Sequence, residues 1–114
     1  MNRGEIYFTE LPRPAGRAGT EQFGTRPAVI IQATPANHST IVIVPMTSNL
    51  SADRYSHCFV VSRSTENGLT KDSVALVHQI RAIDKSRLKN KAGELSKEDL
   101  QKLETEISLL LNLS

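Results

Sequence analysis

The stretch Thr40-Ile41-Val42-Ile43-Val44-Pro45-Met46 (residues 40–46) combines a run of β-branched residues with a following proline. Consecutive β-branched side chains fit the pleated surface of a sheet, and the run is too short for a free-standing helix. We therefore expect a strand at residues 40–46, with its partners in the segments on either side.

Runs of similar character flank this stretch and are separated by turn signals. We expect further strands at residues 5–8, 28–31, 57–61 and 73–83. Pro27 marks the entry to the second of these, because a proline at the first residue of a strand need not donate to the ladder. Polar turns are expected at residues 35–39 and at Asn67-Gly68. Residues 12–25 are rich in glycine and proline and are expected to form a long loop, which in a compact domain is usually functional or mobile.

The C-terminal segment has a helical period. Ser96 is followed three residues later by Asp99, a pattern typical of a helix start. The apolar stripe of this helix, about four turns long, comprises Leu100, Leu103, Ile107, Leu110 and Leu111. Short strands followed by one amphipathic helix, without βαβ alternation, argue against a parallel sheet. We expect a mainly β fold with a C-terminal α-helix, a small bent antiparallel barrel in one domain spanning residues 1–114.

The composition limits the class of protein and its compartment. The chain has 114 residues and one cysteine, Cys58, so it forms no intrachain disulfide, which fits a reducing cytoplasm. No apolar run approaches the roughly 18 residues of a membrane span, and the charged start lacks the pattern of a signal peptide. The formal net charge of +2 is too small to argue for nucleic-acid binding. Arg13, Arg17 and Arg26, in or beside the loop, could form a local patch that attracts phosphate or could be ordinary solvated side chains. We expect a cytoplasmic protein with no membrane partner.

Metal and cofactor chemistry has little support in the sequence. His38, His57 and His78 lack the spacing of metal ligands, and a phosphate-binding loop and a Ser/His/Asp pattern are absent. His78 alternates with apolar residues, so we expect a packed or interfacial histidine on a strand face rather than a ligand. Cys58 is expected to be a small core residue. The prediction is therefore no metal and no cofactor.

Four short blocks carry a more specific signal. They are Arg3-Gly4-Glu5-Ile6-Tyr7-Phe8, the Glu-Gln-x-Gly-x-Arg-Pro of residues 21–27, the Pro-x-Thr of residues 45–47, and residues 72–88. In this order, and covering about residues 3–93, the blocks resemble the MazF/PemK toxins, although the loop carries an extra stretch at residues 16–19. The resemblance implies the CcdB/PemK-like toxin fold, a dimeric SH3-like antiparallel β-barrel that cleaves single-stranded RNA at short sequences. It also implies a cognate antitoxin as a protein partner.

The same resemblance suggests the site residues. By motif position, Arg26 and Thr47 match the family's catalytic arginine and threonine, and Glu21 matches an acidic loop residue that some members use in catalysis. The candidate RNA contacts are Arg13, Arg17, Gln22, Ser48, Asn49, Gln79 and Arg81. Gln79 and Arg81 would share one strand face, about 7 Å apart, although Arg81 could equally be structural or interfacial.

The chemistry of RNA cleavage suits these residue types. RNA carries its own nucleophile, the 2′-hydroxyl, so an enzyme need only align it, move protons and stabilise charge on the phosphoryl oxygens. Arg26 is permanently charged and forks onto phosphate oxygens, which suits transition-state stabilisation. The Thr47 hydroxyl can donate to a phosphoryl oxygen or orient the ribose, and Glu21 could accept the 2′-hydroxyl proton. The expected products are a 2′,3′-cyclic phosphate and a 5′-hydroxyl, by a route that needs no divalent metal.

Other interpretations of the same residues stay open. Arg26 could bridge to a carboxylate, and Thr47 could simply end a strand. A toxin of the same fold could bind a protein such as DNA gyrase without nuclease activity. A non-catalytic RNA-binding module is a third possibility, although two tyrosines and three phenylalanines argue against a broad stacking platform. A homodimer is expected, because the apolar runs 41–44 and 58–61 exceed what a half-exposed sheet needs in so short a chain.

Overall fold

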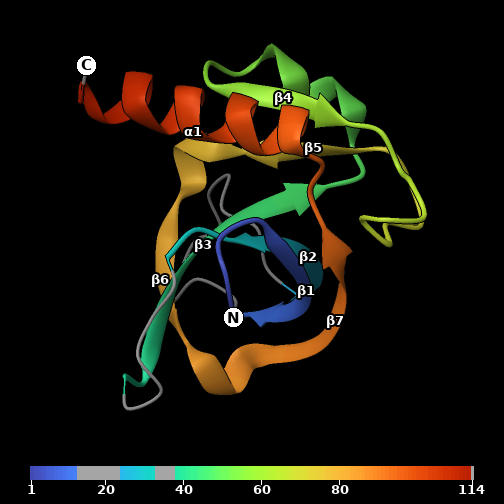
Figure 1. Cartoon of the computed structure of the whole chain (residues 1–114), viewed down its shortest axis with the longest axis vertical. Coiled ribbons are helices and arrows are strands. Elements are labelled where there is room, and N and C mark those ends of the chain that lie inside the picture. The colour runs from blue at the N-terminus through green and yellow to red at the C-terminus, as the bar shows by residue number, and fades with distance from the viewer. Residues whose placement is uncertain (13–23, 33–37, 114) are drawn as a thin grey trace.

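A bent antiparallel sheet and a C-terminal helix make up the described part of the chain (Figure 1). The computed structural model describes residues 1–12, 24–32 and 38–113. The strands are β1 (Glu5–Leu11), β2 (Gly24–Ile30), β3 (Thr40–Thr47), β4 (Cys58–Val61), β5 (Ser73–Leu76), β6 (Arg81–Asp84) and β7 (Leu88–Glu94). The helix is α1 (Lys97–Leu111), and short 3-10 helices are η1 (Leu50–Arg54), η2 (Val77–Gln79) and η3 (Lys85–Arg87). The expected mainly β fold with a C-terminal helix is confirmed.

Strand β3 organises the sheet, whose order is β4-β5-β3-β2-β1-β7, with β6 also paired to β3. Along one edge β3 pairs with β2. Along the other edge its first half pairs with β6, up to Ile43 opposite Arg81, and its end pairs with β5, where Thr47 lies opposite Val74. Sharing one edge between two partners bends the sheet toward a barrel. Among the described residues the pairing does not close, so the barrel stays open between β4 and β7.

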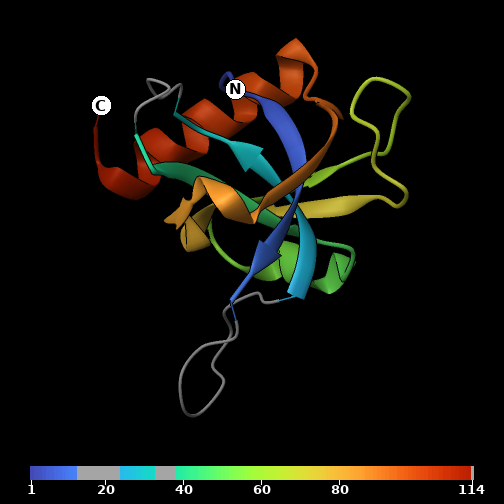
Figure 2. The same cartoon turned by 90° about the horizontal axis from the view of Figure 1, so that it is seen from below.

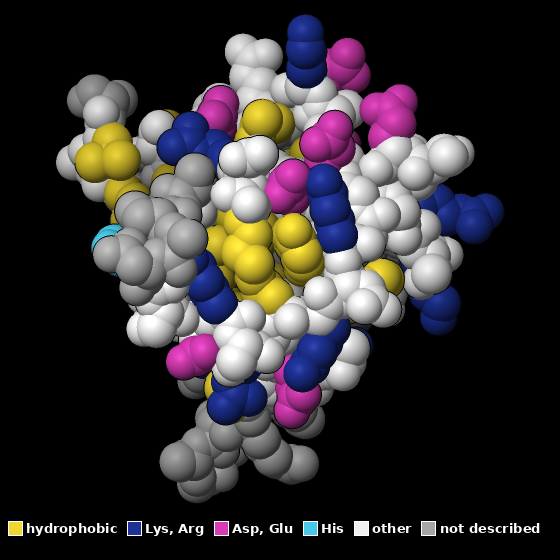
Figure 3. All heavy atoms as spheres, turned by 60° about the horizontal axis from the view of Figure 1, so that its bottom comes forward, with side chains coloured by type: hydrophobic (Ala, Val, Ile, Leu, Met, Phe, Trp, Pro, Cys, Tyr) yellow, Lys and Arg dark blue, Asp and Glu magenta, His cyan; other side chains and the backbone are white. Residues whose placement is uncertain are grey.

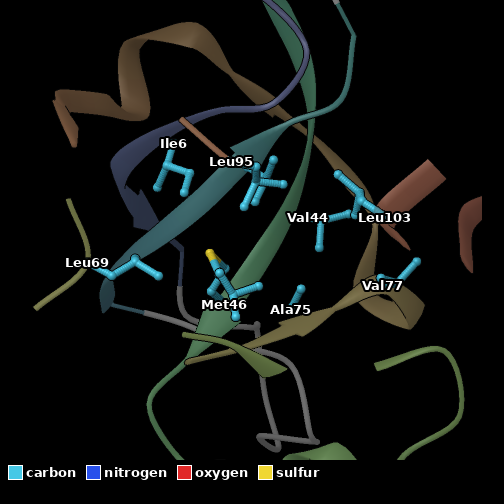
Figure 4. Close-up of a cluster of buried hydrophobic side chains, with 10 residues drawn as sticks. Ile6, Val44, Met46, Leu69, Ala75, Val77, Leu95 and Leu103 are labelled. Atoms are coloured by element: carbon cyan, nitrogen blue, oxygen red, sulfur yellow. The ribbon is translucent and has the colours of Figure 1, made fainter. Parts of the chain in front are cut away.

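Both faces of β3 are buried, which explains its uninterrupted apolar run. Ile41 and Ile43 pack in one cluster with Ile30 of β2. Val44 and Met46 face the opposite cluster, beneath α1. Figure 4 shows side chains of this second cluster, among them Ile6, Val44, Met46, Leu69, Ala75, Val77, Leu95 and Leu103. A strand that is covered on both faces need not alternate apolar and polar residues.

Helix α1 begins where the capping pattern predicts. The Ser96 hydroxyl accepts a hydrogen bond from the Asp99 N–H at 3.1 Å, and Leu103 is fully buried against the sheet. Leu111 was expected on the apolar stripe, and this is wrong: its side chain is half exposed, in a last turn that extends past the sheet (Figure 1). In the described ranges, no helix is long and apolar enough to cross a membrane.

The expected strand at residues 73–83 is interrupted. Strand β5 ends at Leu76, η2 follows, and β6 begins at Arg81. His78 therefore lies on η2 with an exposed side chain, and its predicted place on an apolar strand face is wrong. The turn of 3-10 helix is what allows the two strands to pair with different parts of β3.

The sequence also misplaced the start of β2 and missed β7 altogether. Gly24 and Thr25, assigned to the loop, belong to β2, and Pro27 is an interior residue of that strand, opposite Phe8 of β1. Strand β7 is poor in β-branched residues and is specified by its pairing with β1. Most of the expected loop and of the turn at 35–39 lies outside the described residues.

Candidate active site

The candidate site opens where β2 and β3 separate. Their ladder runs from Ile30 opposite Ile43 to Ala28 opposite Pro45. From Met46 onward β3 pairs with β5 on its other edge. Pro27 and Pro45 flank the end of the β2–β3 ladder, and a proline has no N–H to donate to a neighbouring strand. The two strands are thus free to diverge at this point.

A hollow of about 230 Å³ lies where the two strands diverge. It is lined by Phe8, Thr25, Arg26, Pro27, Met46, Ser48, Leu69, Thr70, Lys71 and Ser73. This set combines an apolar floor with four hydroxyls and two cations, and in the described part of the chain no carboxylate lines it. Hydroxyls and cations around an apolar floor suit a sugar-phosphate better than a cationic ligand.

Arg26 is held at the hollow by its strand. It lies opposite Thr9 of β1, whose fully buried hydroxyl donates to the Tyr7 carbonyl at 3.1 Å. The Arg26 side chain is half-buried and lines the hollow. A guanidinium in this setting is partly desolvated, which strengthens its attraction for an anion.

Thr47 is buried at the end of β3, with 7% of its surface exposed, between the lining residues Met46 and Ser48. Its Oγ1 accepts a hydrogen bond from the Asn49 N–H at 3.2 Å. That contact uses a lone pair and leaves the hydroxyl proton available for donation. Arg26 and Thr47 each lie two positions beyond Ala28 and Pro45, the last pair of the β2–β3 ladder, and Thr47 is not among the residues that line the hollow.

The predicted RNA contacts are only partly brought together. Ser48 is exposed and lines the hollow, as expected of a contact. The Asn49 side chain accepts from the Ser51 N–H at 3.2 Å and the Ser51 hydroxyl at 2.7 Å, so it caps η1. Arg13, Arg17, Glu21 and Gln22 lie outside the described residues.

Gln79 and Arg81 do not join this site. Gln79 lies on η2 and Arg81 begins β6, so the prediction that they share one strand face is wrong. Arg81 lies opposite Ile43, in the row of Ile30, which is four residues from Arg26 along β2. At the rise of a strand, Arg26 is roughly 13 Å along β2 from the row that contains Arg81.

Sequence reasoning missed one whole wall of the hollow. Leu69, Thr70 and Lys71 come from the segment between β4 and β5, and Ser73 is the first residue of β5. The Asn67-Gly68 pattern predicts a tight turn in this segment but does not indicate which other residues the segment contacts. Its proximity to Arg26 follows only from the pairing of β5 with β3.

A second polar cluster lies away from the hollow. Cys58 Sγ and His78 Nδ1 are 3.1 Å apart, and His57 Nδ1 is 3.1 Å from Glu106 Oε1. Burial raises the pKa of the Cys58 thiol and lowers the pKa of His78, which favours a neutral pair. Cys58 is only half-buried, so it is less enclosed than predicted. Within the described ranges, no three His, Cys, Asp or Glu side chains are placed to hold a metal ion.

Comparison with known proteins gives a consistent result. The family described as PemK-like, MazF-like toxin of type II toxin–antitoxin system matches residues 2–111. Endoribonuclease MazF of Staphylococcus saprophyticus is 34% identical over 115 residues, covering 99% of this chain and 92% of the relative. A mycobacterial endoribonuclease, solved in complex with its cognate antitoxin, superposes with a TM-score of 0.74 at 19% identity, covering 98% of this chain and 95% of that one. The MazE–MazF structure from Deinococcus radiodurans (form II) gives a TM-score of 0.64 at 26% identity, covering 97% and 94%.

Proposed function

The chain belongs to the PemK-like, MazF-like toxins of type II toxin–antitoxin systems, and we propose that this MazF-type endoribonuclease cleaves single-stranded RNA, mRNA above all, at a short sequence without a metal ion. The observation that carries the proposal is the hollow where β2 and β3 diverge, with Arg26 in its wall and Thr47 beside it. An mRNA substrate would place the activity in the cytoplasm, in a single toxin domain spanning residues 1–114.

The proposed reaction is an internal transfer at phosphorus. The 2′-oxygen attacks the adjacent phosphorus, the bond to the 5′-oxygen breaks and that oxygen takes a proton from water, so that a 2′,3′-cyclic phosphate and a 5′-hydroxyl result. Arg26 stabilises the charge that develops on the phosphoryl oxygens, and its half-buried position supports this role. Thr47 donates its hydroxyl proton to a phosphoryl oxygen or orients the ribose. Glu21 would accept the 2′-hydroxyl proton. The candidate RNA contacts Arg13, Arg17, Gln22 and Ser48 would hold the neighbouring nucleotides.

The assay that tests this proposal uses pure protein and a long single-stranded RNA in excess EDTA. We expect cleavage at a repeated short sequence, with 5′ ends that a polynucleotide kinase labels directly and 3′ ends that resist ligation until the cyclic phosphate is opened and the resulting phosphate is removed. Cleavage that appears only after divalent ions are added would overturn the metal-free route. Failure to cut any RNA, with or without ions, would favour the alternative toxin that binds a protein such as DNA gyrase.

The proposal includes a cognate antitoxin and a homodimer. Solved relatives contain a toxin with its antitoxin, which supports a protein inhibitor for this chain as well. The apolar run of β3 is buried within the chain itself, so it no longer argues for a dimer. Support comes instead from exposed apolar side chains at the end of α1, where Leu109 is 57% and Leu111 50% exposed. Light scattering at micromolar concentration would contradict the dimer if it gave the 12.6 kDa monomer mass.

A further inference from the structure

Part of the lining of the hollow comes from the connection between β4 and β5. Residues 62–72 form the connection between β4 and β5, which projects beside β7 (Figure 1, Figure 2). Its residues Leu69, Thr70 and Lys71 line the same hollow as Arg26. None of the site residues expected from the family resemblance comes from this connection.

The connection is held in place from inside by Asn67. Only 3% of Asn67 is exposed, and its Oδ1 accepts hydrogen bonds from the N–H groups of Ser64 (2.9 Å) and Leu69 (3.0 Å). Its Nδ2 donates to the Ser62 carbonyl at 2.8 Å, and its own N–H donates to the Ser64 hydroxyl at 3.1 Å. A buried amide with all of these partners leaves the backbone little freedom.

The connection is also fitted against β7. A Cβ added to Gly68, whose φ is +67°, would come within 2.0 Å of the Ala92 carbonyl oxygen. A Cβ on Gly93 would meet the Glu66 carbonyl oxygen at 2.2 Å. Leu69 is buried in the core cluster beside Met46 (Figure 4). The backbone that carries Thr70 and Lys71 is therefore preorganised over the hollow.

Lys71 supplies the cation of this wall. Its side chain is exposed, and it takes part in none of the ion pairs found in the described ranges. The Lys71 carbonyl accepts from the Ser73 hydroxyl at 3.0 Å, which fixes the backbone beneath the side chain. Acidic and basic side chains are mixed over the face shown in Figure 3, and the net charge is only +2. Attraction for a polyanion must then come from local cations such as Arg26 and Lys71.

We propose that Lys71 binds an RNA phosphate next to the scissile one, so that the connection between β4 and β5 guides the strand across the hollow. This rests on the proposed ribonuclease function. A lysine on a flexible stem acts as a point charge that contacts the phosphate equally in the ground state and the transition state. Such uniform binding lowers KM and leaves kcat unchanged. Arg26, which lines the same hollow from β2, acts mainly on kcat.

The test compares Lys71→Ala with Lys102→Ala, an exposed lysine on α1 that serves as the matched control. The substrates are a short RNA containing the mapped cut site and the same RNA with neutral methylphosphonates in place of the phosphates that flank the scissile one. For the short RNA, Lys71→Ala should raise KM roughly tenfold at low salt, the loss of one charged hydrogen bond. The slope of log affinity against log salt should fall by about 0.7, the value for one phosphate contact on a single strand. On the methylphosphonate RNA, Lys71→Ala and wild type should have the same KM and kcat, and on the unmodified RNA Lys71→Arg should restore KM.

A binding measurement separates this inference from the proposed function. The same short RNA with a 2′-deoxy sugar at the cut site lacks the nucleophile, so its fluorescence anisotropy reports binding alone. Weaker binding of this RNA by Lys71→Ala than by Lys102→Ala supports the lysine contact even if cleavage were to follow another route. Equal binding by both variants, or a fall in kcat of Lys71→Ala on the methylphosphonate RNA, would overturn the assignment of Lys71 to a flanking phosphate.

Discussion

The Asn49 N–H donates to Thr47 Oγ1 at 3.2 Å, which orients the threonine hydroxyl at the end of β3. One lone pair of the oxygen is thereby engaged, while its proton can still be donated to a substrate. The hydroxyl is thus positioned by the backbone before RNA arrives.

Replacing this hydroxyl should separate positioning from packing. Thr47→Ser keeps the oxygen and should retain most activity. Thr47→Val keeps the shape without the oxygen, and we expect its cleavage rate to fall about 10–100-fold, with a loss of stability of about 1 kcal/mol. Initial rates in EDTA, together with urea unfolding curves, measure both. Wild-type rates in the folded valine variant would show that Thr47 only terminates its strand.

Arg26→Ala should lower the cleavage rate about 10²–10³-fold with the fold intact, because the lost charge acts where phosphoryl charge develops. The effect should fall on kcat more than on KM. Arg26→Lys keeps the charge but not the forked geometry, so we expect an intermediate rate. Arg87→Ala, in η3, is the matched control and should cut normally. Circular dichroism checks that each variant is folded, and an unchanged rate in folded Arg26→Ala would move the active site elsewhere.

Gly68→Ala tests the close fit between the β4–β5 connection and β7. The new methyl group would collide with the Ala92 carbonyl oxygen, and the backbone φ of +67° is unfavourable for alanine. We expect a loss of about 3 kcal/mol in the free energy of unfolding. Gly24→Ala is the control, since its φ is also positive, at +86°, but nothing lies within 4 Å of its added Cβ. It should cost only about 1 kcal/mol. Equal melting temperatures for the two variants would argue against a rigid connection.

The Glu5 carboxylate should make the free energy of unfolding depend on pH in the acid range. Its carboxylate accepts from Lys91 Nζ at 2.9 Å and from the Asn2 N–H at 2.8 Å, and these contacts, the lysine first, lower the pKa of Glu5. When the pKa of a carboxyl is lower in the folded state than in the unfolded state, its contribution to stability is fully present above the unfolded-state pKa, about 4.3 for glutamate. That contribution is lost as the pH falls through the folded-state pKa. Glu5→Gln should therefore be less stable than wild type at pH 7, with a gap that narrows toward pH 3.

Urea unfolding at pH 7, 5 and 3 measures this gap. Glu104→Gln is the control, because the Arg3–Glu104 pair at 2.9 Å is largely exposed and should contribute little at any of these values. A gap for Glu5→Gln that stays constant between pH 7 and pH 3 would mean that the pair with Lys91 does not titrate as described.

The sequence by itself determined the elements whose signal is local. The β-branched run at residues 40–46 predicts β3 because consecutive Ile and Val suit a strand buried on both faces, and the Ser96–Asp99 pattern predicts the start of α1 because its capping bond is made within one turn. The order of the short blocks predicted the family, and with it Arg26 and Thr47 as the residues to examine.

Only the tertiary structure decided what surrounds those two residues. β7 lacks a strand-like composition and exists because β1 offers it a hydrogen-bonding edge. Gln79 and Arg81, two positions apart in sequence, are separated by a turn of 3-10 helix because β5 and β6 pair with different parts of β3. Lys71 reaches the hollow through the packing of its connection on β7, a contact between segments about 25 residues apart. Such long-range pairings depend on which edges and faces remain unfilled once the whole chain has collapsed, and no local pattern of residues encodes that.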